Sequence, residues 1–174
     1  MPYWRWIERF GKPEALRVAG NAEYLRRAVE LARQNVLAGA GGPFAALIVR
    51  DGQVIAEAAN SVTTTNDPTA HAEVNAIRKA CQALGTFSLE GCEIYSSCEP
   101  CPMCLAAIYW ARMKAVYFGA SQADAARAGF DDAFLYGEVS KPLADRMIPA
   151  VQMLPEEAWA AFAAWVASGK KVEY

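Results

Sequence analysis

The sequence predicts an α/β fold in which a mixed sheet is covered by helices on both faces. Segments with the three- and four-residue apolar spacing of helices alternate with short apolar runs typical of strands, and this alternation indicates helices packed on a sheet. The chain has 174 residues, of which 54% are hydrophobic, which is sufficient for one sizeable core. It contains no repeat and no low-complexity linker, so a single domain is expected.

The first elements are a helix and a hairpin. Residues 22–37 place apolar side chains three and four apart, which predicts an amphipathic helix. Residues 44–49 and 54–59 are short β-rich runs, and the dipeptide Asp51-Gly52 between them is typical of a tight turn. The two runs are therefore expected to pair as antiparallel strands.

Two further helices and two further strands alternate after the hairpin. Helices are predicted over residues 71–84 and over residues 102–112, the second beginning with a proline at its first position. Strands are predicted over residues 92–97 and 115–120. The loop over residues 60–66 is polar and is expected to lack regular structure.

The ends of the chain carry weaker patterns. After residue 121 we expect a fifth strand over residues 147–154 and a helix over residues 156–167. Residues 1–20 mix aromatic, charged and glycine residues without a period, which indicates an N-terminal extension packed on a domain of residues 21–174.

Charge and hydropathy exclude several classes of protein. The 17 lysines and arginines against 19 aspartates and glutamates leave a net charge of −2, which disfavours a long nucleic-acid ligand. The longest apolar runs, among them Met103 to Ala111, are far shorter than the roughly 20 residues of a membrane span. Glu8 and Arg9 interrupt any signal-peptide core. We therefore expect a soluble, cytoplasmic protein without a membrane partner.

A metal site is predicted from four residues at the starts of two helices. His71 is the only histidine, and Glu73 follows it two residues later. Cys101 and Cys104 are three residues apart at a helix start, so both sulfur atoms can face one point. One histidine and two cysteines are three zinc ligands, and three protein ligands are typical of a catalytic site that keeps one position for water. Glu73 is then a general acid and base and not a ligand.

The order H-x-E and then P-C-x-x-C is the pattern of zinc nucleobase deaminases, but other interpretations remain open. Cys98 extends the motif to C-x-x-C-x-x-C, which resembles part of an iron–sulfur loop, although Ile108 stands where a fourth cysteine is expected. Cys101 and Cys104 also fit a redox pair. With Cys98 as a fourth ligand, the site becomes structural and the protein a non-catalytic, zinc-stabilised binding module.

Together these motifs resemble the cytidine-deaminase-like superfamily and, within it, the bacterial guanine deaminases. The resemblance covers about residues 22–174 and is carried by the segments 41–44, 66–73, 97–104, 108–112 and 128–132 and by the final tyrosine. It implies a three-layer αβα sandwich with a mixed five-stranded sheet and one Zn²⁺ per subunit on His71, Cys101 and Cys104. It also implies hydrolytic deamination of guanine to xanthine and ammonia in purine salvage or catabolism. Zinc hydroxide would attack C2 while Glu73 shuttles protons.

The same resemblance implies a set of substrate-binding residues. Asn60 contacts the base, the backbone of Ala72 helps to hold it, and an aromatic slot is formed by Phe44, Trp110 and Phe130. From the residues alone, a place in the core is the favoured interpretation of these aromatic side chains.

Residues near the C-terminus are also implicated by the resemblance. Asp132 binds the guanine edge and assists proton transfer, although it also fits a helix cap. The protein is expected to be a homodimer that exchanges its C-terminal segments, so that Tyr174 acts in the partner's site. Ala45 stands where the family pattern predicts glycine, so its methyl group is expected to tighten the slot. Related substrates remain alternatives, namely guanosine, cytosine, ammeline or tRNA adenosine.

Overall fold

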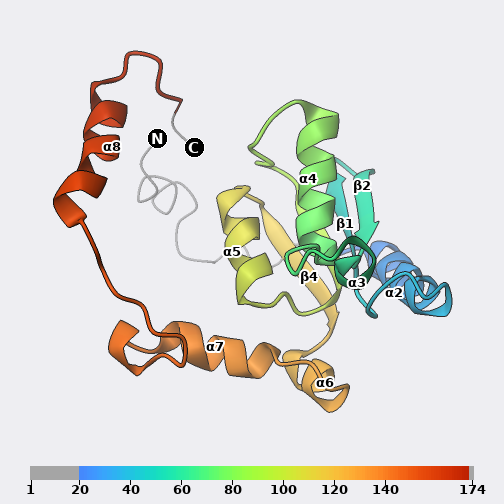
Figure 1. Ribbon diagram of the computed structural model, residues 1–174. Coiled ribbons are helices and arrows are strands. Elements are labelled where there is room, and N and C mark those ends of the chain that lie inside the picture. Colours follow the sequence, from blue (N-terminus) through green and yellow to red (C-terminus); the bar gives the residue numbers. More distant parts are fainter. Residues whose placement is uncertain (1–19, 173–174) are drawn as a thin grey trace. The chain divides into compact units, whose positions relative to one another are not determined.

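The computed structural model describes residues 20–172, which belong to two compact units (Figure 1). The described part of the first unit ends at Val139, and the second unit includes the described residues from Ser140 onward. The predicted N-terminal extension, residues 1–20, lies outside the described residues except for Gly20. The two units are described separately below.

The first unit is built on a four-stranded mixed sheet with strand order β2-β1-β3-β4. β1 (Ala45–Arg50) pairs antiparallel with both β2 (Gln53–Ala59) and β3 (Glu93–Cys98), and β3 pairs parallel with β4 (Ala115–Ala120). Parallel neighbours require a crossover connection, and the helix α5 (Pro102–Trp110) supplies it. The predicted mixed α/β sheet is confirmed.

The expected fifth strand is wrong. Within the described residues the sheet has four strands, and residues 147–154 contain no strand. Met147, Ile148 and Val151 are each more than two-thirds exposed. An apolar run forms a strand only when a neighbouring strand accepts its backbone hydrogen bonds, and periodicity contains no information about that neighbour.

Helices cover both faces of the sheet because the side chains of β1 alternate between two cores. Ala46 and Ile48 pack with alanines of α4 (Ala72–Leu84) and with Ile108 of α5. Leu47 and Val49 point the other way and pack with Ala28 of α2 (Ala22–Leu37). Every residue of β1 except the last is buried, so the layers are α4 and α5, then the sheet, then α2 (Figure 1).

The loops that follow β2 and β3 hold the helix starts of interest. β2 is followed by Asn60 and by α3 (Val62–Thr65), a single turn of helix where a loop without regular structure was expected. The chain then turns at residues 67–70 and enters α4 at its N-cap residue, His71. β3 leads directly to Cys101, the N-cap residue of α5.

Two helices after β4 had no sequence prediction. α6 (Gln122–Arg127) begins with a capping box, in which the Ser121 and Asp124 side chains each accept a hydrogen bond from the other's backbone N–H. A turn through Gly129, which has a positive φ of 91°, leads to α7 (Asp132–Ser140). Each helix has fewer than three turns, which is too short for the repeated apolar spacing that predicts an amphipathic helix.

The second unit contains η1 (Leu143–Asp145) and α8 (Pro155–Ala167) in its described part. α8 confirms the helix expected over residues 156–167, and Pro155 at its first turn starts it. No helix within residues 20–172 is long and apolar enough to cross a membrane.

Candidate active site

The three predicted metal ligands come from two helix N-termini. His71 and Cys101 occupy the N-cap positions of α4 and α5, and Cys104 lies one turn into α5. Pro102 at the first position of α5 fits because that residue needs no backbone donor. The positive ends of both helix dipoles therefore face the same space, which favours thiolate ligands there.

The geometry of the ligand atoms fits tetrahedral zinc. His71 Nδ1 lies 3.6 Å from Cys101 Sγ and 3.5 Å from Cys104 Sγ, and all three ligand atoms lie within 4.8 Å of one another. Zinc at about 2.1 Å from nitrogen and about 2.3 Å from sulfur, with tetrahedral angles, requires an N···S separation of about 3.6 Å. The distances in the structure agree with this value.

The two thiols of the cluster differ in acidity. A hydrogen bond with Cys104 and a second with His71 lower the pKa of Cys101 to about 4 despite its burial. The contact with Cys101, together with burial, raises the pKa of Cys104. The Cys101 partner also raises the pKa of His71. The cluster thus favours a thiolate at Cys101, which is the form that binds a metal.

Glu73 is a buried carboxyl group beside the ligand cluster. Its exposed fraction is 5%. One carboxyl oxygen accepts a hydrogen bond from Ser96 Oγ at 3.0 Å, and the other lies 3.4 Å from Cys104 Sγ. Burial is the largest cause that raises the pKa of Glu73. A buried carboxyl group with a raised pKa, held by a serine on β3, is suited to accept and return a proton.

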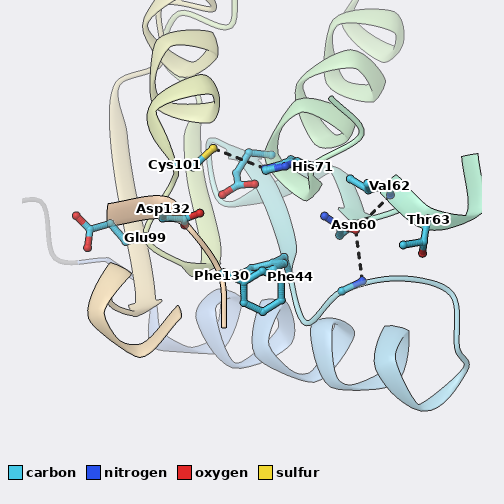
Figure 2. Close-up of a pocket in the computed structure, with 11 residues that line it drawn as sticks. Phe44, Asn60, Val62, Thr63, His71, Glu99, Cys101, Phe130 and Asp132 are labelled. Carbon is cyan, nitrogen blue, oxygen red and sulfur yellow. Dashed lines mark hydrogen bonds between the residues drawn. The ribbon is translucent and has the colours of Figure 1, made fainter. Parts of the chain in front are cut away.

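A pocket of about 260 Å³ opens over this cluster. Figure 2 shows His71 and Cys101 on one side, with the rings of Phe44 and Phe130 opposite them in this view. The two rings meet edge to face, with centroids 4.7 Å apart. The volume is slightly below the roughly 300–1,000 Å³ of common small-molecule sites, so the pocket suits a compact, flat ligand.

Asn60 lies at a further wall of the pocket with its amide oriented by the backbone. Its Oδ1 accepts hydrogen bonds from the N–H groups of Val62 at 3.2 Å and of Gly42 at 3.4 Å (Figure 2). Its Nδ2 therefore points the opposite way. Asn35 of α2 supports this loop, because its Nδ2 donates to the carbonyl groups of Gly42 and Asn60, both at 2.9 Å.

The remaining predicted residues are not all at the pocket. Asp132 lines it, and burial raises the pKa of its carboxyl group. Ala72 is fully buried at the start of α4. Trp110, at the end of α5, is 59% exposed and is not part of the pocket lining, so its substrate role stays a prediction. Tyr174 lies outside the described residues. Ala45 is fully buried in β1 and does not line the pocket.

Four lining residues were missed by sequence reasoning. Gly42, Val62, Thr63 and Glu99 also face the pocket. The position of Glu99 two residues before Cys101 was a usable signal, but a carboxylate at a helix start has a simpler explanation in the helix dipole. Val62 and Thr63 gave no signal, because only the folding of their loop into α3 brings them to the pocket.

Cys98 is separate from the ligand cluster. The group of side chains able to hold a metal within residues 20–172 consists of His71, Cys101 and Cys104. Cys98 is buried at the end of β3, where its Sγ lies 3.8 Å from the carbonyl oxygen of Ser121 and burial raises its pKa to about 11. The geometry therefore favours three protein ligands over a closed site with four.

Sequence comparison agrees with this ligand set. Residues 19–120 match the cytidine and deoxycytidylate deaminase zinc-binding region. This chain belongs to that family. The match contains all three ligands and Glu73, and it confirms the expected zinc cofactor. The three-layer cytidine deaminase-like fold is confirmed as well.

Particular members of the family resemble the chain to different extents. Guanine deaminase from Bacillus subtilis is 58% identical over 151 residues, which are 87% of this chain and 97% of that protein. Its solved structure superposes with a TM-score of 0.86 at 56% identity and covers 90% of this chain and 99% of its own. Guanine deaminase from Nitrosomonas europaea is 33% identical with a TM-score of 0.61, over 71% of this chain and 75% of its own. A tRNA-specific adenosine deaminase from Agrobacterium fabrum is 50% identical over 78 residues, 45% of this chain and 51% of its own.

Proposed function

We propose that this protein is a guanine deaminase, which hydrolyses guanine to xanthine and ammonia. The observation that carries the proposal is the buried Glu73 carboxyl group beside a zinc-ligand triad at the base of a pocket with an aromatic wall. The near full-length similarity to the Bacillus subtilis guanine deaminase supports guanine as the base.

The pocket residues divide the chemistry between them. His71, Cys101 and Cys104 would hold the zinc ion, which when bound would lower the pKa of a water molecule toward about 7. Glu73 takes the proton released as water adds to C2 and delivers it to the ring nitrogen. It then takes the remaining proton from the hydroxyl group added at C2 and gives it to the exocyclic amine. The new C2–O bond forms and the C2–N bond to the exocyclic amine breaks, so that ammonia leaves. Glu73 ends the cycle in its starting state.

The other walls of the pocket orient the base. Phe44 and Phe130 bury its flat faces and edge, and the amide of Asn60 bonds to a ring heteroatom or carbonyl group. Asp132 accepts from the N–H donors of the guanine edge and helps the proton reach the leaving amine. Ala72 supports the base through its backbone.

The charge of the pocket favours a free base over a nucleotide. Three carboxyl groups line it, those of Glu73, Glu99 and Asp132, and no lysine or arginine does so within the described residues. Phosphate groups would be repelled by these carboxylates. The net charge of −2 also lacks the positive field that tRNA binding requires.

Ammonia release from zinc-loaded protein tests the proposal. The panel contains guanine, guanosine, adenine, cytosine, cytidine and ammeline, and Glu73→Gln is the blank because it keeps the shape and the metal ligands but loses the proton carrier. Release dominated by guanine is expected, with turnover by Glu73→Gln reduced by at least about 10²- to 10⁴-fold. Release from another compound would refute guanine as the substrate. If a zinc-loaded protein releases ammonia from none of these compounds, the result would favour a non-catalytic, zinc-stabilised binding module.

We also propose that the protein is a homodimer whose C-terminal segments are exchanged. α8 has only 13 residues, a length at which an isolated helix is marginal in water. Trp159 and Phe162 on it stack at 5.8 Å and are each 61% exposed. A surface of this kind needs a partner, and a second copy of the chain supplies one while placing Tyr174 at the other subunit's pocket.

Mixed dimers of two inactive variants distinguish C-terminal segments that complete the partner's site from segments that complete the site of their own subunit. Glu73→Gln and Tyr174→Phe are each expected to be nearly inactive as pure proteins. Co-refolding them together should restore up to about one quarter of wild-type activity per subunit if Tyr174 acts across the dimer, because half of the dimers are mixed and each has one complete site. No recovery would refute the exchange, and a monomer in light scattering would refute the dimer.

We place the reaction in the cytoplasm. All five cysteines are free in the structure, and thiol ligands persist in a reducing compartment. Fractionation of the producing cell tests this location, and recovery in a secreted fraction would refute it.

A further inference from the structure

α7 carries Asp132 at its first residue, and two side chains on either side of Asp132 attach this part of the chain to the pocket. Phe130, two residues before Asp132, packs its ring against Phe44. Tyr136, four residues after Asp132, donates a hydrogen bond from its hydroxyl group to the carbonyl oxygen of Pro100 at 2.8 Å. The contact between Phe130 and Phe44 forms a wall of the pocket in the proposed function. The hydrogen bond between Tyr136 and Pro100 has no role in it.

The position of Tyr136 couples it to Asp132. Residues four apart in a helix lie on the same face, so the face of α7 that presents Asp132 to the pocket also presents Tyr136 to Pro100. Rotation of α7 about its axis would move both side chains together. A hydrogen bond at Tyr136 therefore restricts the direction of the Asp132 carboxyl group.

The acceptor of this bond is a fixed point next to the metal ligands. Pro100 directly precedes Cys101 and is buried. Glu99, the residue before Pro100, is fixed by two hydrogen bonds to the end of β4 and the start of α6. Its N–H donates to the Ala120 carbonyl oxygen at 2.8 Å, and its carboxylate accepts from the Gln122 N–H at 3.0 Å. The hydrogen bond from α7 to this loop therefore fixes the position of Asp132 relative to the metal ligands.

We infer that Tyr136 is a positioning residue, whose hydroxyl bond to the Pro100 carbonyl group holds Asp132 in the pocket. Tyr136 does not line the pocket, so it acts through Asp132 and does not touch the substrate. The inference rests on the proposed function for its effect on turnover, whereas the attachment of α7 does not depend on the identity of the substrate.

Tyr136→Phe tests the bond because it removes one oxygen atom and keeps the ring. Tyr24→Phe is the matched control, since the Tyr24 hydroxyl group also donates to a backbone carbonyl, that of Gly52 at 2.6 Å, in the turn of the β1–β2 hairpin. In zinc-loaded protein, Tyr136→Phe should increase hydrogen exchange of the amides in residues 132–140 and lower kcat/KM about two- to tenfold. Tyr24→Phe should change neither, and both variants should keep one zinc per chain.

A double-mutant cycle with Asp132→Asn separates positioning from a general structural role. If Tyr136 acts through Asp132, Tyr136→Phe should cost little or nothing further in the Asp132→Asn background. An equal loss in both backgrounds would overturn the inference, as would unchanged exchange of residues 132–140 in Tyr136→Phe. Wild-type protein without activity on guanine would refute the proposed function instead, and the exchange comparison would still decide whether the bond holds α7.

Discussion

Gly41 is a position where one added methyl group should disturb the pocket. An alanine Cβ at this position would lie 2.1 Å from the carbonyl oxygen of Asn60 and 3.0 Å from Asn35 Nδ2. The carbonyl group would have to retreat by about 1.3 Å to reach the 3.4 Å of an ordinary contact. The φ of Gly41 is not positive, so alanine meets no backbone strain there and the clash is the whole perturbation.

The cost follows from what the clash displaces. The Asn35 amide and the Asn60 carbonyl group form a 2.9 Å hydrogen bond, and the added methyl group pushes on both partners. Overpacking of this size costs about 1–3 kcal/mol, and a loss of about 2 kcal/mol lowers the Tm of a chain this long by about 4–8 °C. Because the same shift moves Asn60, kcat/KM for guanine should fall by up to about 10²-fold, the effect of a 1 Å misplacement.

Thermal unfolding and guanine turnover of zinc-loaded Gly41→Ala measure both effects. Gly137→Ala is the matched control, because its Cβ would meet nothing within 4 Å and its φ is not positive. In the helix α7 that control should be neutral or stabilising by up to about 1 kcal/mol. An unchanged Tm and an unchanged kcat/KM in Gly41→Ala would refute the tight packing of Gly41 against Asn60.

Three further predictions concern the metal and the start of α6. Cys101→Ser should lose zinc and lower the Tm, since loss of a ligand removes the binding free energy that supports the fold; a variant with one zinc per chain by metal analysis would contradict the ligand set. Cys98→Ala should keep one zinc per chain, because Cys98 lies outside the cluster, and release of zinc would instead indicate a closed structural site. The Ser121 backbone N–H and hydroxyl group lower the pKa of Asp124, so its contribution to stability should be complete above the unfolded pKa of about 3.9 and be lost as the pH falls through the lower folded value. The difference in Tm between wild type and Asp124→Asn should therefore be present at pH 7 and shrink in acid, and a difference that grows in acid would contradict this assignment.

Local patterns determined much of this protein. The spacing of apolar residues predicted α2, α4, α5, α8 and all four strands to within a few residues, because each of these signals is a property of neighbouring side chains. The ligand set was equally accessible, since His71 and Glu73 start one helix and Cys101 and Cys104 start another.

Tertiary structure decided what depends on distant partners. The run of residues 147–154 is apolar enough for a strand, but no neighbouring strand pairs with it within the described residues. Val62 and Thr63 reach the pocket only because their loop folds into α3. Trp110, at the end of α5, is exposed and does not line the pocket. The contact of Tyr136 with Pro100 joins residues 36 apart in sequence. Such contacts form only when the sheet brings the loops together, because the pattern of a single segment does not specify what it will meet.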